Sequence, residues 1–157
     1  MSRKSIHNKR AIIIDDHKLF TTGLAGILEN IGLKVTATFS NAFDALNYLK
    51  NQDADIIFSD INMPRMDGII FCKKLREKNI ETPIIMLSMY QDSNIIKESF
   101  NNGANGYLSK NTEREEIVTA ISTCLNGATY LNKSIIKREI KNKNSDDISI
   151  KYKLTNR

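Results

Sequence analysis

The sequence predicts an α/β fold in which one parallel sheet is covered by helices on both faces. Two observations lead to this prediction. Five short apolar runs alternate with stretches of helical periodicity, and most of the runs are almost continuously apolar, which is typical of strands buried on both faces. Joined by right-handed crossovers, the five βα units are expected to form a doubly wound sheet of strand order 2-1-3-4-5.

Each expected strand is a short run of apolar, mostly β-branched residues. The runs AIIID, ADIIFSD and TPIIMLS are almost wholly apolar, LKVTATF alternates, and NGYLS is the shortest. In chain order the strands are expected at 11–15, 33–39, 54–60, 82–88 and 105–109. The first, third, fourth and fifth runs end in an acidic pair, an acid, a hydroxyl and a lysine, respectively.

Each expected helix has apolar residues at helical spacing, and most have a polar residue that can cap the first turn. Asn41 is expected to cap the second helix and Asp92 or Ser93 the fourth. Thr112 is expected to cap the fifth, with Glu115 completing a capping box. The helices are expected at about 18–30, 42–51, 68–79, 93–102 and 113–126, the last ending before Gly127.

The positive charge of the chain is concentrated near its C-terminus. Residues 1–130 hold 15 basic and 15 acidic residues, whereas residues 131–157 hold 8 and 3, so the net charge of +5 lies in the second segment. This distribution argues against a nucleic-acid-binding body. We therefore expect a disordered segment at 1–9, a domain at 10–130 and a basic linker at 131–153, in which Ile135, Ile136 and Ile140 form one face of a short helix.

The sequence contains no apolar run long enough to span a bilayer and no secretory signal. Cys72 and Cys124 are far apart and form no CxxC motif, so they are interpreted as buried free thiols. Together these features predict a cytoplasmic protein.

Polar side chains that end parallel strands meet at one edge of the sheet, where ligands bind. Asp15 and Asp16 follow the first strand, and Asp60 ends the third. Clustered carboxylates repel one another and need a cation, and oxygen ligands with room for water suit Mg²⁺. Asp60 is the candidate nucleophile, because a carboxylate can attack a phosphoryl group and form an aspartyl-phosphate.

The other strand ends supply groups that could contact a phosphoryl group. These are the Ser88 hydroxyl and the Lys110 ammonium, while the main-chain carbonyl of Asn62 is a further candidate ligand of Mg²⁺. Each residue also has an ordinary explanation: a helix-capping aspartate, a turn serine, a surface lysine. Tyr107 is either a fixed core aromatic or a movable one. The conjunction of the residues at four strand ends favours one functional site.

The segments IIIDDHKLF, DINMPRMDG, PIIMLSMY and NGYLSK together resemble the receiver domain of two-component response regulators, over about residues 10–127. DDH, MPxMDG and LSMY resemble the NarL/FixJ subfamily, whose receivers precede a LuxR-type helix-turn-helix. The resemblance implies the flavodoxin-like receiver fold and Mg²⁺-dependent phosphorylation by a sensor histidine kinase. The residues that it implies are Asp60 as phosphoacceptor; Asp15, Asp16, Asp60 and the Asn62 carbonyl for Mg²⁺; Ser88 and Lys110 for the phosphoryl group; and Ser88 and Tyr107 as a switch.

Such a receiver is expected to catalyse only its own phosphorylation and slow dephosphorylation, and whether it forms a homodimer is left open. Residues 154–157, LTNR, resemble the opening of a LuxR-type domain. We therefore expect a chain truncated there, which reaches DNA only through the missing domain. Two departures from the family pattern are Asn111 after Lys110, where many receivers have proline, and Met89 after Ser88, where a small residue is common.

Other functions remain open on the sequence. A free-standing receiver could act through protein–protein contacts alone. A haloacid-dehalogenase-type phosphohydrolase also uses an aspartate nucleophile and Mg²⁺, but it needs a second acid where Asn62 stands. A flavin mononucleotide carrier needs a phosphate-binding loop after the first strand, where DDHKLF would repel phosphate.

Overall fold

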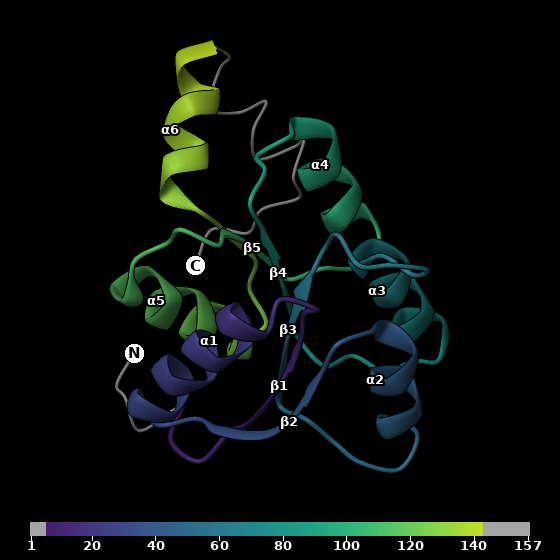
Figure 1. The fold of residues 1–157 in the computed structure, drawn as a ribbon. Coiled ribbons are helices and arrows are strands. Elements are labelled where there is room, and N and C mark those ends of the chain that lie inside the picture. The colour runs from purple at the N-terminus through teal and green to yellow at the C-terminus, as the bar shows by residue number, and fades with distance from the viewer. Residues whose placement is uncertain (1–5, 143–157) are drawn as a thin grey trace.

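A six-stranded sheet forms the middle layer of this computed structural model, which describes residues 6–142. All neighbouring strands pair in parallel, in the order β2-β1-β3-β4-β5-β6 (Figure 1). The predicted order is therefore confirmed, with one further strand at the β5 edge. The strands are β1 (Arg10–Ile14), β2 (Lys34–Phe39), β3 (Ile56–Asp60), β4 (Ile84–Ser88), β5 (Gly106–Ser109) and β6 (Tyr130–Leu131).

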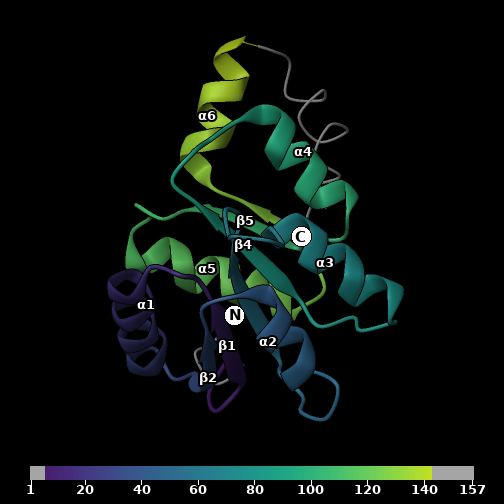
Figure 2. The same cartoon turned by 45° about the vertical axis from the view of Figure 1, so that its right-hand side comes forward.

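Helices cover both faces of the sheet, as the apolar strands predicted. In Figures 1 and 2, α1 and α5 lie on one face and α2, α3 and α4 on the other. The strand residues alternate between two cores: Ala11 and Ile13 join the α1/α5 core, and Ile12 and Ile14 the opposite one. The helices are α1 (Lys18–Asn30), α2 (Ala42–Tyr48), α3 (Gly68–Glu77), α4 (Ser93–Asn101), α5 (Arg114–Leu125) and α6 (Lys133–Asn142).

Two of the predicted helix caps are present and one is wrong. The side chains of Asn41 and Asp92 accept hydrogen bonds from the first turns of α2 and α4. The expected capping box of α5 is absent, because Glu113 precedes the helix and makes no side-chain cap. Instead, the Thr112 hydroxyl donates to Asn132 Oδ1 at 2.7 Å, a distant partner that the local sequence could not indicate.

The domain extends beyond both predicted boundaries. Ile6 is fully buried, and Asn8 N donates to Gly32 O at 2.8 Å, so the disorder predicted for 1–9 is wrong for residues 6–9. At the other end Leu131 and Ile135 belong to the core, so the boundary at residue 130 is too early. The helix expected around Ile135 is present as α6, and the expectations for 143–157 lie outside the described residues.

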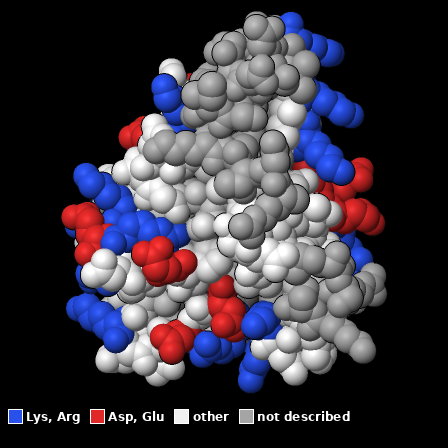
Figure 3. Space-filling model, turned by 180° about the vertical axis from the view of Figure 1, so that it is seen from behind, with Lys and Arg blue, Asp and Glu red and all other residues white. Residues whose placement is uncertain are grey.

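Helix α6 lies beside α4 (Figures 1 and 2). The Arg138 guanidinium donates to the main-chain oxygen of Gln91 at 2.7 Å, and Ser93 contacts Glu139. Seen from behind, Lys and Arg side chains line the edge formed by α6, whereas basic and acidic groups are interspersed lower on this face (Figure 3). Part of the positive charge of the C-terminal segment is thus displayed on a docked helix.

The remaining expectations from composition concern thiols and membranes. Cys72 and Cys124 are buried free thiols, as predicted, and burial raises their pKa values to about 11 and about 12. None of the helices within residues 6–142 has the length and apolar character needed to cross a membrane.

Candidate functional site

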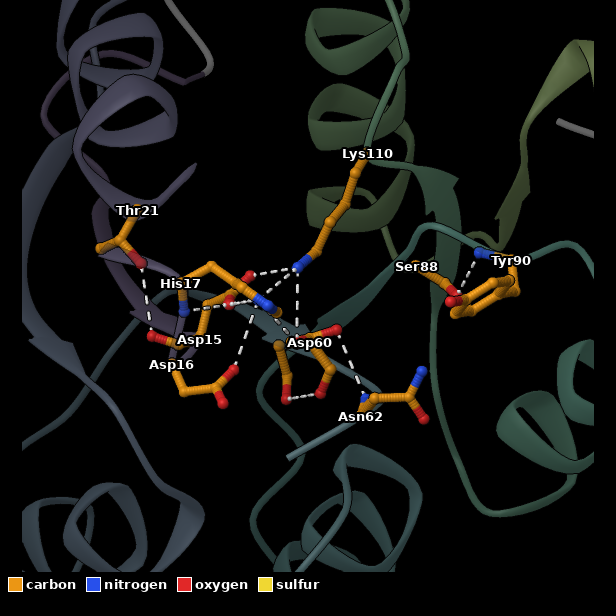
Figure 4. Close-up of polar contacts among 10 residues, drawn as sticks. Asp15, Asp16, His17, Thr21, Asp60, Asn62, Ser88, Tyr90 and Lys110 are labelled. Carbon is orange, nitrogen blue, oxygen red and sulfur yellow. Dashed lines mark hydrogen bonds and ion pairs between the residues drawn. The ribbon is translucent and has the colours of Figure 1, made fainter. Parts of the chain in front are cut away.

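The predicted acidic residues meet at the carboxyl edge of the sheet. Asp15 and Asp16 follow β1, which pairs with β3, and Asp60 is the last residue of β3. Asp15 and Asp60 are 3% and 2% exposed, whereas the Asp16 side chain is 38% exposed. The strand order therefore brings together two buried carboxylates and one at the surface, as Figure 4 shows.

Lys110 reaches from the end of β5 to both buried carboxylates. Its Nζ lies 2.7 Å from Asp15 Oδ2 and 3.4 Å from Asp60 Oδ2, and its side chain is only 5% exposed. The ammonium also lies over the Phe20 ring, 4.6 Å from the centroid. No peptide bond within residues 6–142 is cis, so the Lys110–Asn111 bond is trans. The lysine is thus a buried cation rather than a surface residue.

Two buried oxygens of this cluster share one charged partner. Asp15 Oδ2 and Asp60 Oδ2 accept no hydrogen bond from a neutral group of the described residues, and the Lys110 ammonium lies 2.7 Å from the first and 3.4 Å from the second. Burial, and then the neighbouring charge of Asp15, raise the pKa of Asp60 above its ordinary value, while Lys110 opposes the shift. One ammonium does not fully offset two desolvated carboxylates, so the cluster fits a further cation.

Asn62 orients the nucleophile candidate. Its main-chain N–H donates to Asp60 Oδ1 at 3.3 Å, which leaves Oδ2 directed toward Lys110. Asn62 thus lies beside the carboxylate cluster, where its main-chain carbonyl was predicted to serve (Figure 4).

His17 was not assigned a role by the sequence predictions, yet it lies within the cluster. Its Nδ1 is 3.0 Å from Asp15 Oδ1, 3.4 Å from Asp16 Oδ1 and 3.7 Å from Asp60 Oδ2. The potential ligand atoms of these four residues all lie within 4.8 Å of one another. The available signal was the triplet DDH, in which a third potential metal ligand follows two acids directly.

Ser88 and Tyr107 both contact the backbone of Tyr90. Ser88 is buried, and its Oγ accepts from the main-chain N–H of Tyr90 at 3.0 Å rather than facing Asp60 (Figure 4). The Tyr107 ring is fully buried, its hydroxyl donates to the Tyr90 carbonyl at 2.9 Å, and burial raises its pKa. The sequence left open whether Tyr107 is a fixed or a movable aromatic, and in this structure its ring is buried.

A glycine allows α3 to begin directly beside Asp60. A Cβ on Gly68 would lie 2.3 Å from the main-chain oxygen of Asp60, well inside van der Waals contact. Asp67 caps this helix by accepting from Ile70 N at 2.8 Å. The DG pair of DINMPRMDG thus sets the close approach of the helix to the backbone of Asp60.

We expect the stability of the metal-free protein to fall as the pH rises through the folded-state pKa of Asp60. Because that pKa is raised, the folded state binds the proton more tightly than the unfolded state does. The stabilisation is complete below the unfolded-state pKa and is lost above the folded-state one. Denaturant unfolding at a series of pH values rising from about 4, the ordinary pKa of an aspartate, should therefore show a decline in the stability of the native protein that is smaller in Asp60→Asn. Parallel pH profiles for the two proteins would contradict this prediction.

Comparison with known proteins gives one family match. The model of the response regulator receiver domain matches residues 11–122, which is more than half of the chain. The oxygen regulatory protein NreC of Staphylococcus haemolyticus is 32% identical over 146 residues, which cover 89% of this chain and 67% of NreC. The response regulator UvrY of Escherichia coli is 30% identical over 128 residues, which cover 81% of this chain but only 59% of UvrY.

Solved structures show the same fold. A two-component response regulator of the LuxR family from Aurantimonas superposes with a TM-score of 0.80 at 26% identity, covering 87% of this chain and 99% of that one. The receiver domain of the response regulator NarL from Mycobacterium tuberculosis gives a TM-score of 0.73 at 29% identity, covering 77% and 98%.

Proposed function

Because this chain belongs to the response regulator receiver family, we propose that it is the phosphoacceptor of a two-component pathway and that Asp60 receives the phosphoryl group. The observation that carries the proposal is the buried Asp60 carboxylate beside Asp15 and Lys110. Its Oδ2 faces Lys110 Nζ at 3.4 Å and accepts no hydrogen bond from a neutral group of the described residues. The donor would be the phosphohistidine of a sensor kinase, in the cytoplasm.

The transfer is a displacement at phosphorus. An Asp60 carboxylate oxygen attacks, the O–P bond forms as the P–N bond to the donor histidine breaks, and the bonding pair leaves with the ring nitrogen, which takes a proton from solvent. Lys110 places a positive charge beside Asp60 Oδ2, where the phosphoryl oxygens would arrive. The Ser88 hydroxyl would have to exchange its contact with Tyr90 N for one with the phosphoryl group.

The residues present fit a divalent cation. Asp15, Asp16, Asp60 and the main-chain carbonyl of Asn62 would hold Mg²⁺, and the buried oxygens without hydrogen bonds support this assignment. When bound, Mg²⁺ would reduce the repulsion between the Asp60 carboxylate and the incoming phosphoryl oxygens. Asp15 and Asn62 orient the site, the latter through its N–H to Asp60 Oδ1.

Intact mass spectrometry tests the proposal. Incubation of the chain with acetyl phosphate and Mg²⁺ should add about 80 Da, the mass of one phosphoryl group replacing a proton. The adduct should be absent with EDTA and absent in Asp60→Asn, which keeps the size of the side chain. An adduct of the same yield in Asp60→Asn would place the phosphoryl group elsewhere and refute the assignment.

Asp16→Ala is expected to weaken Mg²⁺ binding more than Ser88→Ala does. An anionic oxygen is a direct partner of a hard divalent cation, whereas the Ser88 hydroxyl is bonded to Tyr90 N and lies apart from the carboxylates. Calorimetric titration of the two variants with Mg²⁺ measures the difference. Equal Mg²⁺ affinities would contradict this division of roles.

The output of the pathway is part of the same proposal. We propose that phosphorylation changes the contacts of Ser88 and Tyr107 and so controls a transcriptional regulator, through a DNA-binding domain or a phosphorylation-dependent homodimer. The names of the relatives, among them a response regulator and an oxygen regulatory protein, support this output. A receiver that acts by protein contacts alone remains the alternative.

A further inference from the structure

We propose that His17 is a direct ligand of the cation in this site and that its imidazole favours a first-row transition-metal dication, such as Mn²⁺ or Co²⁺, relative to an all-oxygen site. The inference rests on the proposed function, because it requires a cation among Asp15, Asp16 and Asp60. It goes further by assigning a nitrogen ligand and a metal preference to this chain.

One nitrogen of the ring faces all three carboxylates. Nδ1 lies between 3.0 and 3.7 Å from an oxygen of each of Asp15, Asp16 and Asp60. The main chain holds the residue in this place, because His17 N donates to Asp15 Oδ1 at 2.8 Å at the start of α1. The ring is therefore directed into the cluster by a backbone contact.

The buried oxygens supply a second and independent observation. Asp15 Oδ2 and Asp60 Oδ2 accept no hydrogen bond from a neutral group in the described part of the chain and share one ammonium, that of Lys110, so the charge of two desolvated carboxylates is only partly offset. Lys110 and His17 approach different oxygens of Asp15: the ammonium contacts Oδ2, and Nδ1 contacts Oδ1. At Asp60 both groups approach Oδ2, Lys110 Nζ at 3.4 Å and His17 Nδ1 at 3.7 Å, and the two nitrogens lie 3.4 Å apart.

The type of ligand then determines which metal ions bind more tightly when the His17 imidazole is a ligand. Carboxylate and carbonyl oxygens suit Mg²⁺, Ca²⁺ and Mn²⁺, whereas imidazole suits the borderline metals and adds little for Mg²⁺, which keeps several waters. The imidazole must carry its proton on Nε2 to offer Nδ1 to a metal. Since the His17 side chain is 63% exposed, Nε2 can meet solvent and the residue can be replaced without opening a cavity.

The matched variants are His17→Ala and His7→Ala, because His7 and His17 are the two histidines of the chain. Mn²⁺ is added to each protein without a phosphodonor, and pulsed electron paramagnetic resonance reports whether a nitrogen nucleus is bound to the ion. Calorimetry gives the affinities for Co²⁺ and Mg²⁺. Asp15→Asn is included to place the ion in this site.

We expect the Mn²⁺ signal of the native protein and of His7→Ala to be modulated by a bound nitrogen nucleus. This nitrogen modulation should be lost in His17→Ala. Residues that only orient metal ligands are worth about 10-fold to 100-fold in affinity, so His17→Ala should weaken Co²⁺ binding by at least about tenfold. Mg²⁺ affinity should change by less than about twofold.

Three results would overturn the inference. Mn²⁺ that binds the native protein without nitrogen modulation excludes His17 as a ligand while leaving the phosphoacceptor proposal intact. Equal losses of Co²⁺ and Mg²⁺ affinity in His17→Ala exclude the metal preference. Mn²⁺ binding that survives Asp15→Asn places the ion elsewhere. By contrast, a native protein that binds neither Mg²⁺ nor Mn²⁺ would contradict the proposed function itself.

Discussion

Replacing Lys110 with methionine will lower the free energy of unfolding of the metal-free protein by roughly 3 kcal/mol, the cost of removing one partner of a buried ion pair. The Lys110 side chain is 5% exposed, and the side chains of Asp15 and Asp60 are 0% and 4% exposed. Without the ammonium, two carboxylates with oxygens that accept no hydrogen bond from residues 6–142 would face each other in a desolvated site.

The loss of stability in Lys110→Met should depend on the other charges of the site. Mg²⁺ can take over part of the charge of the lysine, so the native and variant proteins should differ less in its presence. Low pH should also reduce the difference in stability between the native and variant proteins. Without Lys110 the pKa of Asp60 would rise further, so acid would neutralise this carboxylate more readily in the variant. Phosphorylation should fall sharply, since a cation beside Asp60 Oδ2 is lost.

Denaturant unfolding with and without Mg²⁺ measures these effects. Lys73→Met is the matched control, because Lys73 is an exposed lysine of α3, whereas the ammonium that contacts Asp15 and Asp60 is that of Lys110. It should change stability by less than about 0.5 kcal/mol. If Lys110→Met were as stable as Lys73→Met without metal, the buried lysine would not be needed to hold the carboxylates together.

Gly68→Ala is expected to be the most disruptive small substitution beside the site. The new Cβ would lie 2.3 Å from Asp60 O and 3.1 Å from the Cα of Ile61, and neither backbone atom can move without shifting the end of β3. Overpacking of this kind costs typically 1–3 kcal/mol. The shift would also displace Asp60, so the yield of phosphorylated protein should fall with stability.

Gly26→Ala is the matched control for this substitution. Gly26 lies within α1, and a Cβ there would meet nothing within 4 Å. Alanine is the better helix former by roughly 0.5–1 kcal/mol, so this variant should be slightly more stable than the native protein. Thermal unfolding and the acetyl phosphate assay on both variants test the contrast. Equal stability of the two variants would show that α3 can move away from Asp60 at little cost.

The strand ends were predictable because two local signals coincide there. An apolar run marks a strand, and the residue after it lies at the edge, so Asp15, Asp60 and Lys110 could be brought together by strand order alone. The caps Asn41 and Asp92 were predictable for a similar reason, since a capping side chain bonds to its own first turn.

Features that depend on distant partners were not predictable. Thr112 does not cap α5 because its hydroxyl has a partner twenty residues away, and β6 is only two residues long, too short for a periodic signal. The side-chain direction of His17 follows from a hydrogen bond between its own N–H and Asp15. Residue type alone could suggest a metal ligand there but not the direction of the ring.

The docking of α6 couples the position of this helix to the conformation of the loop between β4 and α4. The Ser88 hydroxyl holds the N–H of Tyr90, and the next residue, Gln91, offers its carbonyl to Arg138 of α6. A rearrangement that turns the Ser88 hydroxyl toward Asp60 releases the N–H of Tyr90, and Tyr90 directly precedes the residue that Arg138 holds. By thermodynamic reciprocity, any interaction of the following residues that draws α6 from its docked position also disfavours the present conformation of this loop. Amide protection at Tyr90 and helicity at residues 133–142 are therefore expected to change together when the loop rearranges.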